Sequence, residues 1–462
     1  MPGRERLVPL IVACPLFLQN LDTSVMATAL PSMARSLDVQ PLHLNLAITA
    51  YLLSLAVFLP LSGWCAERFG TRRVFCAAIG FFAFGSALCG IADSLGTLVL
   101  FRIVQGLGGA LMVPVGRLIL LRSVTPSRMV SAMVWFTVPP TIGRMIGPLV
   151  GGAIVSVTSW RWIFLLNIPF GLLGRVLALG FIDEQPPEPG AREPFDSAGF
   201  VLLALGLIGL LGALELAGKG MLGSLAVGGA GALGLACMLA YVWRSRRVAS
   251  PLIDLGILRF ATYRNAIVGG LPLRIAIGAS PFLLPLMLQL GFGLSPLQSG
   301  ALTVATALGS LSTRAVMARV IGRFGFRNLM LATALTTSVC YVSYGLFTPA
   351  TPHPLMFGVM LLGGLVNSMG LVAMQTLGYS QIPPPRMSHA TALSVMVQQV
   401  SVAFGVVLGA TLVALAASLH GGDPAQPAAA DFSPAFWAIG GMSLLSLFSF
   451  ARLDRNAGAE LR

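Results

Sequence analysis

Fourteen long apolar windows constrain the fold of this chain more than any other feature of its sequence. A helix needs about 20 mainly apolar residues to cross about 30 Å of hydrocarbon, and each window reaches that length. Only 10% of the 462 residues are charged, whereas soluble globular domains carry about 25%. The chain is therefore predicted to be an all-α polytopic membrane protein, which excludes a soluble enzyme or a secreted domain. The windows are 7–30, 45–65, 74–92, 97–121, 129–157, 161–182, 198–217, 221–243, 264–290, 298–318, 328–347, 354–377, 390–419 and 434–451.

The basic residues between the windows agree with this count when the N-terminus lies inside. Twenty of them fall in the segments predicted to be cytoplasmic and three in the segments predicted to be outside. The positive-inside rule expects such an asymmetry. Removing 198–217 and 221–243 together would keep the parity, so twelve spans remain an alternative. We expect a multi-pass protein of a bacterial inner membrane with both termini cytoplasmic, and the net charge of +13 requires no nucleic-acid partner.

Six further arginines lie inside the windows, where each costs at least about 2.5 kcal/mol at bilayer depth. They are Arg102, Arg117, Arg144, Arg175, Arg274 and Arg314. Arg117 and Arg175 are near enough to window ends to reach the interface. The others predict a polar interior or a water-filled cavity. The candidate residues of a substrate cavity are Gln19, Asn20, Gln105, Arg274, Arg314, Asn367, Gln375 and Gln398.

Two short motifs recur at one offset along the chain. The sequence R-F-G-T-R at 68–72 returns as R-F-G-F-R at 323–327, and Pro41-Leu42 returns at 296–297, each 255 residues later. Both pairs occupy the same place in a helix–loop–helix unit, which indicates duplication. We divide the chain into an N-terminal six-helix half (1–183), an inserted two-helix segment (184–250) and a C-terminal six-helix half (251–462). Membrane proteins built from such repeats bind their substrates near the midplane.

The loop after the second window, residues 63–73, reads G-W-C-A-E-R-F-G-T-R-R. It resembles the G-x-L-A-D-R-x-G-R-K signature of the major facilitator superfamily, with Cys65, Glu67 and Thr71 as departures. Gly70 permits a tight turn, and Glu67 can pair with the arginines or lie at a helix N-terminus. The resemblance implies a gating loop on the inner side. Its residues are Gly63, Glu67, Arg68, Gly70, Arg72 and Arg73, with Arg323, Gly325 and Arg327 in the repeat.

A glycine pattern marks the window 129–157, where Gly143, Gly147 and Gly151 stand four residues apart. They line one helix face and let another backbone approach closely, while Pro148 weakens the helix there. With Gly152, these residues resemble the G-P-x-x-G-G motif of the antiporter branch. Plain helix packing is the alternative interpretation. Ser401, Gly405 and Gly409 form a looser counterpart in 390–419.

Leu21-Asp22-Thr23-Ser24, followed by A-L-P at 29–31, resembles the L-D-x-T…A-L-P signature of the fourteen-span drug:H⁺ antiporters. Arg102-x2-Gln105-Gly106 resembles the R-x-x-Q-G motif of the same family. The similarity extends through nearly the whole chain, including 114–117 and 162–169. It implies the major facilitator fold, with two inserted helices, and export of small amphipathic compounds in exchange for protons by alternating access.

Helix rise places three ionisable residues at one depth. Asp22 lies about 22 Å from the inner edge, Arg102 about 8 Å from the outer edge, and Arg144 about 22 Å from the inner edge. An intramembrane carboxylate with a basic partner is by default a functional site. We predict that Asp22 is the protonatable residue and that Arg102 or Arg144 holds it ionised. The alternative is a permanent pair that only fixes helix packing.

Other residues and absences add to this interpretation. Glu215 stands four residues before Lys219, and we favour a structural role for it. Because no G-x4-G-K-[ST] motif is present, we expect a proton gradient rather than ATP or any cofactor to drive transport. No spacing of His and Cys predicts a metal site or catalysis. We expect a monomer in lipid. Export of an organic anion such as a carboxylate metabolite, which the arginines favour, and a non-transporting sensor or scaffold remain alternatives.

Overall fold

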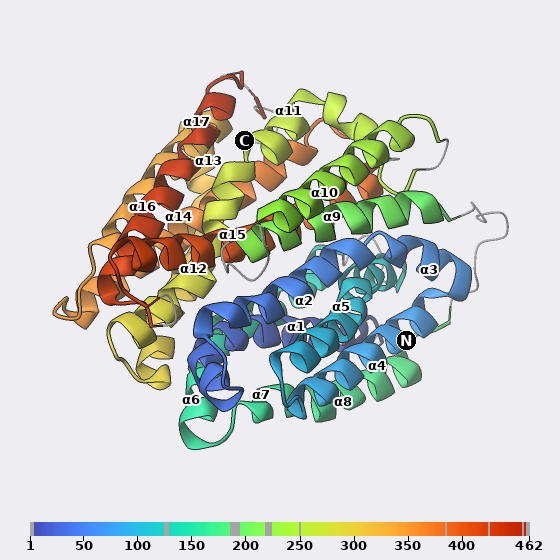
Figure 1. Ribbon diagram of the computed structural model, residues 1–462. Helices are drawn as coiled ribbons and strands as arrows, with labels where there is room; N and C mark the ends of the chain where they lie inside the picture. Colours follow the sequence, from blue (N-terminus) through green and yellow to red (C-terminus); the bar gives the residue numbers. More distant parts are fainter. Residues whose placement is uncertain are drawn as a thin grey trace. The chain divides into compact units, whose positions relative to one another are not determined.

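The computed structural model describes residues 4–123, 129–184, 195–217, 224–248, 251–383, 386–423, 426–454 and 457–458. Within these ranges the chain is helical and contains no strand. It divides into two compact units, Met1–Ser197 and Ala198–Arg462 (Figure 1). The predicted N-terminal half falls in the first unit, and the helices of the predicted insertion fall with the C-terminal half in the second.

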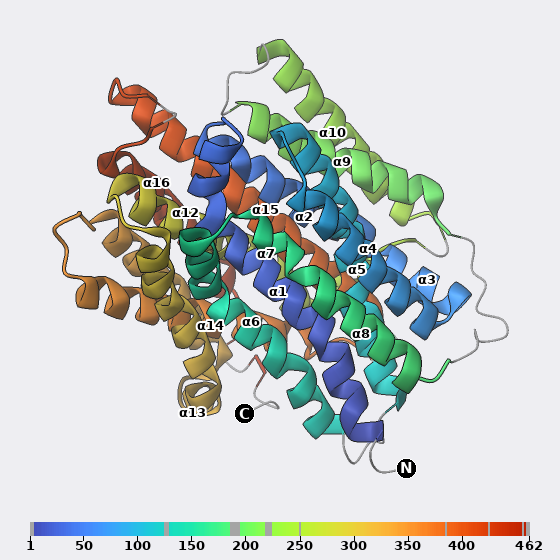
Figure 2. The same ribbon diagram turned by 90° about the horizontal axis from the view of Figure 1, so that it is seen from below.

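The first unit contains α1, which carries Asp22, and the helices that surround it. Contacts are most extensive between α1 and α6, which lie side by side in Figure 2, and between α4 and α5. A break at Pro60 separates α2 from α3, since proline has no backbone N–H to continue the ladder. The elements are α1 (Arg4–Ser36), η1 (Pro41–Leu44), α2 (Asn45–Phe58), α3 (Leu61–Phe69), α4 (Thr71–Gly90), α5 (Leu95–Ser123), α6 (Met129–Val157), α7 (Arg161–Leu165) and α8 (Asn167–Phe181).

The second unit follows the same plan after two further helices, α9 (Ser197–Ala217) and α10 (Ser224–Ser245). The backbones of α9 and α10 touch at Gly209 and Gly234. The largest contacts of the remaining helices join α13 to α14 and α12 to α15. These elements are η3 (Leu255–Arg259), α11 (Ala261–Arg264), η4 (Asn265–Gly269), α12 (Leu271–Leu286), η5 (Met287–Gly291), α13 (Pro296–Gly345), α14 (His353–Tyr379), α15 (Met387–Leu419), α16 (Ala429–Ser443) and α17 (Leu445–Phe450).

Among the described residues, eleven helices are long and apolar enough to cross a bilayer. They support a multi-pass membrane protein. The predicted windows 129–157, 298–318 and 328–347 are not among these eleven: the first lies on α6 and the other two lie on α13. The count of fourteen spans therefore stays a prediction.

The repeated motifs adopt the same backbone at both places. Gly70 has φ 88° and ψ 143° between α3 and α4, and Gly325 has φ 73° and ψ 167° inside α13, which it divides into two helical parts. Side chains with a Cβ rarely adopt this region. Pro41 begins η1, and Pro296 begins α13. Two equivalent glycines and two equivalent prolines thus support the internal duplication.

Candidate functional site

Asp22 lies at the centre of a buried polar cluster in the first unit. Its Oδ2 accepts a hydrogen bond from Nη1 of Arg102 at 2.6 Å, and the two side chains are 0% and 1% exposed. Its Oδ1 accepts from Nε2 of Gln105 at 3.1 Å and from Nδ2 of Asn167 at 3.0 Å. The carboxylate therefore receives one ionic and two amide hydrogen bonds.

Further contacts fix the groups that surround Asp22. Arg102 Nη1 also donates to Oε1 of Gln105 at 2.6 Å. The same arginine therefore orients both Asp22 and the amide of Gln105. Its Cζ lies 4.7 Å from the ring centroid of Tyr51 and 5.2 Å from that of Phe164, within the range of cation–π attraction. Asn167 Nδ2 donates to Oγ of Ser86 at 2.9 Å. Helices α1, α2, α4, α5, α7 and α8 thus meet at a single charged pair.

Arg144, the other predicted partner of Asp22, is placed elsewhere. Its Nη2 donates to Oδ1 of Asn20 at 2.7 Å. The side chain of Ser24 donates to the Arg144 backbone carbonyl at 2.9 Å. Asn20 and Asp22 are two residues apart, which is about 200° around a helix. Helices α5 and α6 therefore present their arginines to different sides of α1.

The glycine face of α6 packs on α1 beside the cluster. A Cβ on Gly143 would lie 2.6 Å from the carbonyl of Phe17, and one on Gly147 would lie 2.5 Å from Cβ of Ser24. A Cβ on Gly151 would meet Val25 at 2.8 Å. Gly152 is buried in the same helix, and α6 continues through Pro148. The motif therefore sets the distance of α6 from the segment of α1 that holds Asp22.

The second unit repeats this packing. A Cβ on Gly405 of α15 would strike the carbonyl of Ile275, and one on Gly409 would lie 3.1 Å from Leu283. Gly278 of α12 approaches Val402 in return. In both units a glycine face holds a helix, α1 or α12, against its neighbour.

Arg72 of the predicted gating loop, and Arg327 in the repeat, each stabilise the end of a helix. Arg72 Nη1 donates to the carbonyls of Leu179 and Ile182, at 3.5 and 3.2 Å, at the end of α8. Arg327 Nη2 donates to the carbonyl of Ala451 at 2.9 Å, just after α17. A cation at a helix C-terminus satisfies carbonyls that lack a helical partner and opposes the helix dipole.

Glu184, which follows α8, pairs with arginines of the predicted gating loop. It was not singled out from the sequence. Its Oε2 lies 3.1 Å from Nε of Arg72 and 3.5 Å from Nε of Arg73. Arg68 and Arg323 are exposed, and a Cβ on Gly63 would meet no atom within 4 Å. The side chain of Glu67, the acid predicted to pair here, lies outside the described residues.

The predicted substrate-cavity residues are divided between the units. Gln19, Asn20 and Gln105 lie in the first unit, where Gln105 belongs to the Asp22 cluster. In the second, Gln375 Nε2 donates to Oε1 of Gln398 at 3.3 Å, and Oδ1 of Asn367 accepts from Thr337 at 3.0 Å. Arg274 is 2% exposed. The side chains of Arg314 and Glu215, and the whole of Lys219, lie outside the described residues.

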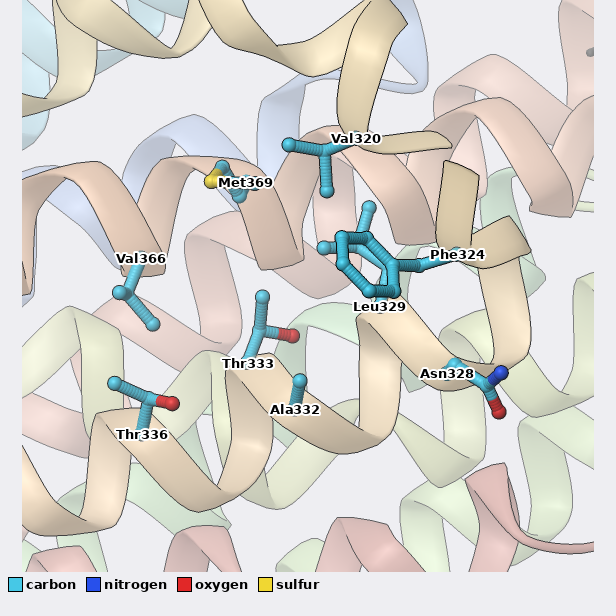
Figure 3. A pocket seen from close by; sticks show the side chains of 9 residues that line it. All are labelled: Val320, Phe324, Asn328, Leu329, Ala332, Thr333, Thr336, Val366 and Met369. Atoms are coloured by element: carbon cyan, nitrogen blue, oxygen red, sulfur yellow. The ribbon is translucent and has the colours of Figure 1, made fainter. Parts of the chain in front are cut away.

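A cavity of about 360 Å³ in the second unit is lined by none of these residues (Figure 3). It lies between the two parts of α13 and the facing side of α14, and its wall is mainly apolar. The lining residues are Val320, Phe324, Asn328, Leu329, Ala332, Thr333, Thr336, Val366 and Met369.

Some residues of the site were missed by sequence reasoning. Asn167 binds the Asp22 carboxylate directly, and Ser86 contacts it through Asn167. The rings of Tyr51 and Phe164 lie against the Arg102 guanidinium. Asn167 was part of a motif in 162–169, but no role was assigned to it. The available signal was an amide at the start of a long apolar helix, where burial requires a polar partner.

Comparison with known proteins agrees with this architecture. The profile of the Major Facilitator Superfamily matches residues 12–250 and 266–461. The "Putative multidrug resistance protein MdtD" of Salmonella paratyphi A is 36% identical over 423 residues, which is 91% of this chain and 89% of that protein. The protein of the same name from Klebsiella pneumoniae is 36% identical over 460 residues, covering 100% and 97%.

Solved structures show the same fold at low identity. A POT family transporter in complex with 5-aminolevulinic acid superposes with a TM-score of 0.71 at 14% identity, covering 99% of this chain and 96% of that one. A D-xylose-proton symporter gives 0.69 at 17% identity, covering 98% of each chain. These likenesses concern the fold alone. With the family match over most of its length, the chain belongs to the major facilitator superfamily and is a transporter rather than an enzyme.

Proposed function

We propose that this protein exports small amphipathic compounds in exchange for protons by alternating access. The observation that carries the proposal is the buried ion pair between Asp22 and Arg102. The MdtD relatives, which are named for multidrug resistance, support the substrate class. No cofactor is required, because the proton gradient supplies the energy. A location in the bacterial inner membrane, cytoplasmic termini and a monomeric state are parts of the same proposal.

Because the Asp22–Arg102 pair is buried, it can couple proton binding to a movement of the helices. The Asp22 side chain is 0% exposed, so a proton reaches it only after the surrounding helices separate. Protonation would leave the Arg102 guanidinium without its counter-charge in an apolar interior, which is costly. The two protonation states therefore favour different packings of α1, α5 and α8, and a ligand or proton that prefers one packing shifts the population.

The direct test replaces the acid in reconstituted protein. Proteoliposomes with an imposed pH gradient are offered a panel of lipophilic cations and organic anions, and proton movement is followed with an internal pH dye. The wild-type protein should release protons when a substrate is added. Asp22→Asn should reduce this flux to that of protein-free liposomes, because an amide does not ionise. Substrate exchange without a gradient should persist.

Asp93→Asn is the matched control, since Asp93 is an exposed acid just after α4 and accepts a hydrogen bond only from nearby Thr97 in the described contacts. It should behave as wild type. Unchanged proton coupling in Asp22→Asn would show that the pair only fixes packing. A protein that moves neither substrate nor protons would favour the sensor alternative.

A further inference from the structure

Arg274 on α12 is a buried cation for which the described residues provide no hydrogen-bond partner. It is 2% exposed, and none of Nε, Nη1 and Nη2 has a hydrogen-bond partner among the described residues. A guanidinium carries five N–H donors. Burial of an unpaired charge is among the most costly arrangements in a protein, and ordinarily a counter-ion is present. Arg274 therefore requires a counter-charge that none of the described residues supplies.

The sequence around Arg274 offers no internal acid to supply that charge. Residues 255–422, which span η3 to α15, contain eight arginines and no aspartate or glutamate. Three acids flank this stretch, and each has another partner. Asp254 lies 3.7 Å from Arg386, and Asp431 lies 2.7 Å from His420. Asp423, which directly follows the stretch, has an interaction of its own. An anion for Arg274 must therefore come from beyond the helices that surround it.

Arg274 is fixed in a buried position. It is the fourth residue of α12 and lies in the candidate span Leu271–Gly291, and it is nevertheless 2% exposed. The helix is fixed on both sides: Leu273 N donates to Oγ of Ser446 at 3.1 Å, and Gly405 of α15 lies against the carbonyl of Ile275. The helix that carries the guanidinium is therefore held in place by its neighbours.

Two tyrosines of the same unit, Tyr263 on α11 and Tyr379 at the end of α14, contact each other. Their ring centroids are 6.2 Å apart. The hydroxyl of Tyr263 donates to the carbonyl of Ala390 at 2.6 Å, so its ring is fixed. A buried guanidinium on a helix whose neighbouring residues Leu273 and Ile275 are buried and apolar is suited to a compound with an anionic group on an apolar body.

We propose that Arg274 binds the anionic group of the transported compound, so that the substrates include small organic anions with an aromatic or aliphatic body. This inference rests on the proposed export function and deepens it, because it selects the anion over the lipophilic cation. A carboxylate can accept two parallel hydrogen bonds from one guanidinium, which adds geometric selectivity to charge.

The test measures equilibrium binding to the full-length protein in detergent, without a gradient. The probes are 1-naphthoate and its neutral analogue 1-naphthamide. The wild-type protein should bind the carboxylate, and Arg274→Gln should weaken binding by at least about tenfold, whereas the amide should bind weakly to both. Arg274→Lys should restore part of the affinity. Arg264→Gln is the matched control, since Arg264 is an exposed arginine ten residues earlier.

Other outcomes would overturn the proposal. Equal affinity for carboxylate and amide, or equal affinity in wild type and Arg274→Gln, would show that the guanidinium does not select anions. Because the variant loses an unpaired buried charge, it should melt no lower than wild type. A clear drop in melting temperature would reveal an internal partner and contradict the inference.

A phospholipid phosphate could offer the same chemistry, and the lipid composition separates the two sources. Binding is repeated in nanodiscs of phosphatidylcholine alone and with added phosphatidylglycerol. Loss of 1-naphthoate binding only with phosphatidylglycerol would identify a lipid headgroup as the occupant and overturn a substrate role. If binding depends on Arg274 but no proton-coupled flux is seen, the inference holds and the proposed function fails. If proton-coupled flux of 1-naphthoate is the same in wild type and Arg274→Gln, the proposed function holds and the inference fails.

Discussion

Helices α1 and α12 occupy equivalent places in the two units but carry different charges. Each is held by a glycine face, from α6 in one unit and α15 in the other. On α1 the buried charge is Asp22, which receives three hydrogen bonds from side chains. On α12 it is Arg274, which donates no hydrogen bond within the described residues. Duplication therefore preserved the backbone arrangement, while the chemistry of the buried charges diverged.

This difference suggests separate tasks for the two units. A satisfied ion pair can change state only when a proton enters, which suits the coupling reaction that we propose. An unsatisfied cation changes state when an anion arrives, which suits a binding role. The comparison is sharpened by changing equivalent features in both units and asking whether the effects agree.

The largest expected effect comes from removing each buried arginine. Arg102→Met leaves the Asp22 carboxylate buried without its ion partner and should destabilise the protein by about 3–5 kcal/mol. Arg274→Met removes a charge that has no partner and should leave the stability unchanged or raise it. Thermal unfolding in detergent, followed by tryptophan fluorescence, measures both. Equal losses in the two variants would abolish the distinction between the paired and the unpaired arginine.

A smaller effect is expected at the repeated glycines. Gly70→Ala and Gly325→Ala introduce a Cβ at φ 88° and 73°, so each should lower stability, by about 1–2 kcal/mol. Gly63→Ala and Gly322→Ala are controls in the neighbouring helices, where a Cβ meets nothing within 4 Å. The controls should be neutral or stabilising by about 0.5–1 kcal/mol. If Gly70→Ala lowered the stability and Gly325→Ala did not, the two motifs would match in sequence but not in their structural role.

The smallest effect is expected at the arginines that stabilise the ends of α8 and α17. Arg72→Gln and Arg327→Gln each remove hydrogen bonds to carbonyls and should cost about 0.5–1.5 kcal/mol. Arg72 also pairs with Glu184, whereas the contacts of Arg327 in the described residues are to a carbonyl. The cost of Arg72→Gln should therefore decrease as salt is added. Melting temperatures of both variants from low to high salt test this. If the costs of Arg72→Gln and Arg327→Gln changed equally with salt, the ion pair between Arg72 and Glu184 would not contribute to stability.

Much of the scaffold could be predicted from local sequence. The windows 129–157, 354–377 and 390–419 lie within two or three residues of α6, α14 and α15. The glycines at 143, 147 and 151 were expected to let a backbone approach, and α1 lies there. These features depend on hydropathy, helical periodicity and the size of one side chain, all of which can be read along the chain. The break inside α13 at Gly325 was indicated by its match to Gly70.

The partner of Asp22 was a different problem. Depth along a helix placed Arg102 and Arg144 at the same level, because the rise per residue gives only the axial coordinate. The choice depends on which helix faces which side of α1, and Asn20 rather than Asp22 faces Arg144. The involvement of Asn167 and Glu184 depends on contacts across 145 and 112 residues. No local pattern contains that information.

By itself the sequence determined that this is a helical membrane protein built from a repeated unit, with a carboxylate at depth and an excess of arginine. Those properties follow from hydropathy, charge distribution and matching motifs, which need no neighbour to be evaluated. The tertiary structure decided which arginine neutralises Asp22, and it decided that Arg274 is buried with no partner among the residues that it describes. Pairing and burial are properties of the space between helices, and the rotation of each helix about its axis sets them.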